Sequence, residues 1–109
     1  MTNYTKEQIQ ANLKAITDLV NSDVGTTEEK SEKLSRLASI SALAAEMQGA
    51  ARGLYQKELG TAIRIIAKEK YQASIVKTMA EGECWELSAL YEFSVRCSAI
   101  ISHNMEALS

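Results

Sequence analysis

The sequence contains no proline, and it has only one histidine, one phenylalanine and one tryptophan among its 109 residues. Average proline usage of roughly 5% would give several in a chain of this length. Proline interrupts helices and alanine favours them, so the missing proline and the fifteen alanines predict a mostly helical chain. No segment alternates regularly between polar and apolar residues, and no strand is predicted. We therefore expect an all-α protein.

Long apolar runs are also lacking. The longest uncharged interior runs, 37–45 and 97–105, hold nine residues each, whereas a membrane-spanning helix needs about 20. The first residues show no basic segment followed by an apolar one, so no signal peptide is expected. Cys84 and Cys97 lie on one predicted helix, about 20 Å apart, and cannot form a disulfide with each other. We expect two buried thiols and a reduced, cytoplasmic setting.

Neither sign of charge is in large excess, because 12 basic and 14 acidic residues give a net charge of -2. This balance argues against a globally basic nucleic-acid binder and leaves a local basic patch open. The charge is nevertheless uneven, since residues 48–80 carry six bases and two acids whereas residues 81–109 carry one base and five acids. These charges are interpreted either as solvated or mutually attracting helix faces, or as an anion contact that involves Arg52, Lys57, Arg64 and Lys68.

Periodic apolar residues divide the chain into helices within one domain, 1–109. The spacing predicts helices over about 6–21, 27–58, 61–80 and 84–108. The first two begin with capping patterns, Thr5 to Gln8 and Thr26 to Glu29. Gly25 is expected to adopt the left-handed conformation after the first helix, and Gly82 to end the third.

The role of Gly60 stays open, because it either separates two helices or lies within one very long helix. The four segments predict a bundle of three or four helices. The last helix is long for so small a domain, and Trp85, Phe93 and Ile100 lie off its main apolar stripe. Gly49 and Gly53 are interpreted as a ridge that lets another backbone approach closely. A homo-oligomer, most simply a dimer, explains the second apolar face.

The last helix holds the only concentrated set of polar residues. Glu92 and Arg96 stand four apart and share a face, and His103 follows seven residues later. No nucleophile elbow, HExxH, P-loop or GxGxxG motif is present, so no catalytic residues, metal site or cofactor is predicted. We expect a non-enzymatic protein with a hydrogen-bonded, structural histidine.

Two segments resemble small proteins encoded by phages and mobile elements of Bacteroides-type bacteria. Residues 96–108 resemble their last helix, in which an arginine precedes a Thr-His-Gln run and an acid, and residues 40–47 are similar to their Ser-Gly-Glu-Met helix. The resemblance implies a phage context in a bacterial host and no particular reaction. It also suggests that Glu46 contacts Arg96 or His103 in a polar network.

Three functions remain as hypotheses. The first is an interaction protein that binds a host or viral protein as a homo-oligomer. The second is a protein that binds or sequesters a nucleotide at a subunit interface, with Arg52, Arg64 and Arg96 holding phosphates and Tyr55 or Trp85 stacking on the base. The third is a DNA-associated replication or recombination accessory that uses residues 48–80, and its affinity would fall steeply with salt.

Overall fold

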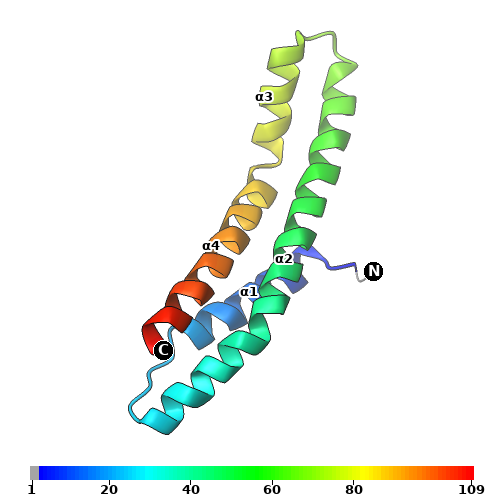
Figure 1. Ribbon diagram of the computed structural model, residues 1–109. Helices are drawn as coiled ribbons and strands as arrows, with labels where there is room; N and C mark the ends of the chain where they lie inside the picture. The colour runs from blue at the N-terminus through cyan, green and yellow to red at the C-terminus, as the bar shows by residue number, and fades with distance from the viewer. Residues whose placement is uncertain (1–2) are drawn as a thin grey trace.

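The computed structural model describes residues 3–109, and within them it contains four helices and no strand. In chain order these are α1 (Lys6–Val20), α2 (Thr27–Ala67), α3 (Ala73–Glu83) and α4 (Trp85–Leu108). Helix α2 runs the length of an elongated molecule, α3 and α4 return along it one after the other, and α1 lies against the lower half (Figure 1). The all-α fold predicted from the sequence is confirmed.

Both predicted capping threonines begin helices. The Thr5 side chain accepts a hydrogen bond from the backbone N–H of Gln8, and the Gln8 side chain accepts one from the N–H of Thr5. Thr26 likewise accepts from the N–H of Glu29, but the Glu29 carboxylate accepts from Gly25 at 2.8 Å. Each cap satisfies backbone donors that the first helical turn leaves without partners.

The expected third helix over 61–80 is wrong, because α2 continues through Gly60 to Ala67. Glycine inside a helix costs only about 1 kcal/mol relative to alanine. Ala62 and Ile66, just beyond Gly60, are buried against α3, and this packing outweighs that cost. The chain reverses at residues 68–72 instead, where Lys70 adopts a left-handed conformation with φ 65°.

The break before the last helix lies at Cys84 and not at Gly82, which is inside α3. The local backbone of Cys84 is not helical, with φ -101° and ψ 19°. Its N–H still donates to the carbonyl of Ala80, and its carbonyl accepts from Ser88. Helices α3 and α4 therefore form one interrupted rod. Gly25 is not left-handed either, since no described glycine has a positive φ.

The buried residues form two separate cores. The larger core joins α1, α2 and α4 in the lower half and includes Ile9, Leu13, Leu37, Met47 and Ile101. The smaller core joins α2 to α3 and Cys84 in the upper half, and its buried members are Ala62, Ile66, Val76, Ala80 and Cys84. Because α1 does not extend this far, the upper half is a two-helix hairpin with small residues at its centre.

The molecule exposes more surface than its size predicts. Its accessible surface is 7376 Å², which is roughly 1,400 Å² more than expected for a folded monomer of 12.0 kDa. Its radius of gyration is 17.9 Å, compared with about 13 Å for a compact domain of this length. The principal extents of 63 × 25 × 16 Å give the reason, since a rod has a high ratio of surface to volume.

Candidate interaction surface

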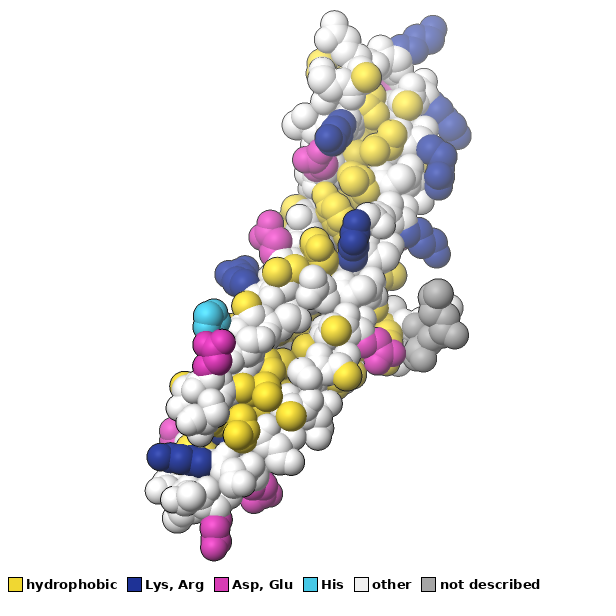
Figure 2. All heavy atoms as spheres, in the orientation of Figure 1, with side chains coloured by type: hydrophobic (Ala, Val, Ile, Leu, Met, Phe, Trp, Pro, Cys, Tyr) yellow, Lys and Arg dark blue, Asp and Glu magenta, His cyan; other side chains and the backbone are white. Residues whose placement is uncertain are grey.

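Large apolar side chains are exposed along the rod formed by α3 and α4. On α3 they are Ile75 and Met79, and on α4 they are Trp85, Phe93, Val95 and Ile100. Figure 2 also shows apolar side chains following the seam between α2 and this rod along the length of the visible face. Val95 lies on the other side of α4 from Phe93, and an isolated exposed apolar residue of this kind is ordinary. The other residues indicate a surface that another molecule covers.

The second apolar face predicted for the last helix is present. Trp85, Phe93 and Ile100 expose 64%, 38% and 43% of their surface, respectively. Trp85 and Phe93 line a shallow, largely apolar hollow that Lys6 and Gln10 of α1 border. The face therefore lies beside α1 and is not covered by it.

The hollow is held in place by an ion pair between Lys6 of α1 and Glu86 of α4. This contact raises the pKa of the Lys6 ammonium above its ordinary value, because the carboxylate accepts a hydrogen bond from the charged form. Both side chains are partly exposed, so the pair contributes little to stability. Its consequence is local, since it fixes the start of α1 against the start of α4.

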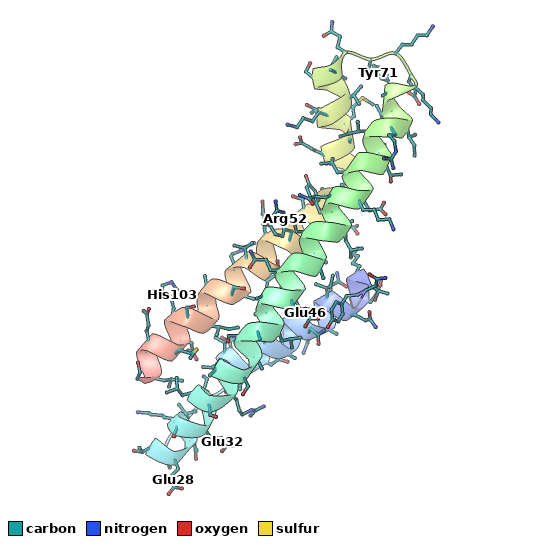
Figure 3. The ribbon with its side chains drawn as sticks, turned by 45° about the vertical axis from the view of Figure 1, so that its right-hand side comes forward. Glu28, Glu32, Glu46, Arg52, Tyr71 and His103 are labelled. Carbon is teal, nitrogen blue, oxygen red and sulfur yellow. The ribbon has the colours of Figure 1, made fainter. Side chains whose placement is uncertain are left out.

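The structure does not bring Glu46 together with Arg96 or His103. Glu46 accepts a hydrogen bond from the Tyr4 hydroxyl at 2.9 Å, and this contact raises the Tyr4 pKa. Arg96 and His103 are exposed on α4, and no hydrogen bond or ion pair within residues 3–109 joins either of them to Glu46. The cyan histidine in Figure 2 lies on the edge of α4 away from α2, and Figure 3 shows Glu46 where α1 crosses α2.

The other members of the polar set in the last helix are also exposed. Glu92 and Arg96 share a face of α4 but do not form an ion pair in the described structure. His103 has no hydrogen bond within the described residues, so the expectation of a hydrogen-bonded structural histidine is not met inside one chain. These side chains are therefore available to a second molecule.

The four bases of the suggested anion contact do not form one site. Lys57 and Arg64 follow one another at helical spacing on the upper part of α2, and Lys68 continues this spacing as the residue that caps the helix end. Arg52 lies on a different side of the helix. Arg64 donates to the Thr61 hydroxyl at 3.3 Å. None of the four belongs to the three ion pairs found within residues 3–109. The geometry is that of solvated charges along a helix.

Gly49 and Gly53 are exposed, and a Cβ atom placed on either would meet nothing within 4 Å. Among residues 3–109, the predicted close approach of another backbone is therefore absent. Both glycines line an open hollow with Tyr4, Glu46 and Lys57. The described lining of this hollow carries the Glu46 carboxylate as well as the Lys57 ammonium, so it offers no net positive charge to an anion.

One buried polar contact was not predicted from the sequence. Lys33 is 7% exposed, and its ammonium donates to the backbone carbonyls of Val20 and Ser22 at 2.7 and 2.8 Å. A lysine at the edge of an apolar stripe resembles any solvated lysine in the sequence. Its role appears only when α2 is packed beside the end of α1.

Both thiols are buried and free, as expected, with Cys84 8% exposed and Cys97 1% exposed. Burial is the main cause that raises the pKa of each thiol. Residues 3–109 contain no cluster of three or more His, Cys, Asp or Glu side chains that could hold a metal ion. They also contain no helix that is both long and apolar enough to cross a bilayer.

Comparisons of the chain with protein-family models, with curated proteins and with solved structures find no match.

Proposed function

We propose that the protein is a non-enzymatic helical interaction protein of a phage or mobile element, which binds a host or viral protein as a homo-oligomer in the bacterial cytoplasm. The observation that carries the proposal is the exposed apolar face of the α3–α4 rod, which includes Ile75, Phe93 and Ile100. The surplus of exposed surface supports it, because a typical protein interface buries about 800 Å² on each partner.

Self-association is tested by native mass spectrometry together with multi-angle light scattering across a range of protein concentrations. The proposal expects a mass near a multiple of the 12.0 kDa of one chain, and a share of monomer that grows on dilution. A monomer at every concentration up to the millimolar range would refute the homo-oligomer.

The same spectra address nucleotide binding, the second hypothesis from the sequence. A retained ligand of a few hundred daltons per subunit would favour it over the interaction protein, and a thermal shift with a panel of nucleotides would then identify the class. At ligand concentrations 100 times the dissociation constant, binding would add about 2.7 kcal/mol to the unfolding free energy. The exposed and dispersed bases predict no shift.

A further inference from the structure

The rod formed by α3 and α4 carries a second helical stripe in addition to the one that faces α2. Starting at Ile75 and taking steps of four and three residues alternately, the stripe passes positions 79, 82, 86, 89, 93, 96, 100 and 103 and ends at Ala107. All ten positions are exposed. Alternating steps of four and three define the heptad seam along which one helix pairs with another.

This α3–α4 stripe is distinct from the core of the chain. The buried residues of the rod, such as Val76, Leu90, Cys97 and Ile101, each directly follow a stripe position. The stripe thus lies about a quarter turn away from the core. Cys84 joins the two helices, since its N–H donates to Ala80 of α3 and its carbonyl accepts from Ser88 of α4. The rod bends at this residue (Figure 1), and seven of the ten stripe positions, from 86 to 107, lie on α4.

We propose that the α3–α4 stripe pairs with the same stripe of a second copy, antiparallel, about a two-fold axis at the level of Tyr91. This inference rests on the proposed function and names the partner and the surface of its self-association. An axis at position 91 is the midpoint of the stripe, so that all ten positions are used. A residue of one copy and a residue of the second copy then lie opposite each other when their two residue numbers add up to 182.

In this register, large side chains lie opposite small ones. Phe93 lies opposite Ala89 of the second copy, Ile100 opposite Gly82, and Ile75 opposite Ala107. A Cβ atom placed on Gly82 would meet nothing within 4 Å, so there is room at Gly82 for an isoleucine from the second copy. Alternation of large and small residues across a helix pair fills the space between the helices without overlap.

The charged and polar positions of the stripe are also complementary. Glu86 lies opposite Arg96 of the second copy, and the two-fold axis makes this pair twice. Met79 lies opposite His103. Lys6 already contacts Glu86 within each chain, so the carboxylate would lie between two cations. Arg96 and His103, which have no hydrogen-bond partner within residues 3–109, face the second copy in this arrangement.

A parallel pair of the same stripes is disfavoured. It would place Glu86 against Glu86, Arg96 against Arg96 and Gly82 against Gly82, with like charges and unfilled space along the seam. The antiparallel arrangement also brings the basic half of each chain towards the acidic last helix of the other. Residues 48–80 have a net charge of +4 and residues 81–109 a net charge of -4, and such complementary potentials favour association.

The first test compares two substitutions of matched exposure on the same helix. Phe93 is 38% exposed on the stripe and Val95 is 39% exposed off it. The wild-type chain is expected to have about twice the mass of one chain in light scattering. Phe93→Glu is expected to give the monomer mass at the same concentration, and Val95→Glu to keep the dimer. Circular dichroism and thermal unfolding of each variant would show that both are folded.

Each other outcome identifies what has failed. A wild-type monomer would overturn this inference together with the homo-oligomer in the proposed function. A dimer that resists Phe93→Glu, or one that Val95→Glu also dissociates, would overturn the stripe while the homo-oligomer stands.

The second test addresses the register. Ala89→Phe places two large rings opposite each other, and Phe93→Ala leaves a gap, so each is expected to weaken the dimer about tenfold or more in sedimentation equilibrium. The double variant A89F/F93A exchanges the large and small positions and is expected to bind within about threefold of wild type. Additive losses in the double variant would overturn the register, because only an axis at position 91 places these two residues opposite each other.

Discussion

Lys33 is a buried lysine of α2 that packs against the end of α1, and its substitution gives a quantitative test of the fold. Lys33 of α2 donates hydrogen bonds to the carbonyls of Val20 and Ser22. The last turn of α1 holds no basic residue of its own. Lys33 therefore supplies the positive charge that stabilises the negative end of the α1 dipole. Lys33→Met keeps an unbranched apolar side chain in the same position but removes both donors.

The expected loss follows from these contacts. A hydrogen bond to a charged group contributes about 1.5–3 kcal/mol when neither partner finds another. Part of this free energy is recovered in the Lys33→Met variant, because Ser22 is exposed and water can bind its carbonyl in place of the lysine. We expect Lys33→Met to reduce the unfolding free energy by about 2–4 kcal/mol, out of a typical total of 5–15 kcal/mol. The unfolding temperature should fall by roughly 10–20 °C.

The measurement is urea and thermal unfolding followed by circular dichroism, with all proteins at one concentration because self-association shifts apparent stability. Lys30→Met is the matched control. Lys30 is exposed one turn earlier on α2 and makes no side-chain hydrogen bond within residues 3–109, so its substitution should change stability by less than about 0.5 kcal/mol. Equal losses in the two variants would refute the role assigned to Lys33.

Three further predictions concern other buried or paired groups. The buried Oδ1 of Asn104 has no hydrogen-bond partner within residues 3–109. Asn104→Leu should therefore raise the unfolding free energy by about 1 kcal/mol in urea titrations, and a loss would show that the amide is satisfied. Cys84 and Cys97 should react slowly with Ellman's reagent at pH 8 and rapidly in urea, since burial raises both pKa values; rapid reaction of the folded chain would contradict this. Folding raises the Lys6 pKa, so the stability that Lys6 contributes is fully present below its unfolded pKa of 10.5 and is lost as the pH rises through the folded pKa. Lys6→Met should reduce this loss of stability at alkaline pH. An unchanged pH profile would contradict the assignment.

The candidate surface was only partly predictable. Helical spacing alone identified Trp85, Phe93 and Ile100 as a second apolar face, because which residues share a side of a helix depends only on their separation along it. Spacing did not identify the partners of Glu46 or Lys33. Those partners, Tyr4, Val20 and Ser22, lie at or just beyond the two ends of α1, and the angle and depth at which α1 meets α2 depend on packing between distant segments.

The sequence by itself determined that the chain is helical and where its first two helices begin. The missing proline, the apolar period and the hydroxyls of Thr5 and Thr26 act over a few neighbouring residues, so their effect can be read locally. Only the tertiary structure decided that α2 passes through Gly60 and that Gly49 and Gly53 stay uncovered. Those outcomes depend on which surfaces meet: Ala62 and Ile66 are buried against α3, whereas no segment within residues 3–109 covers the two glycines.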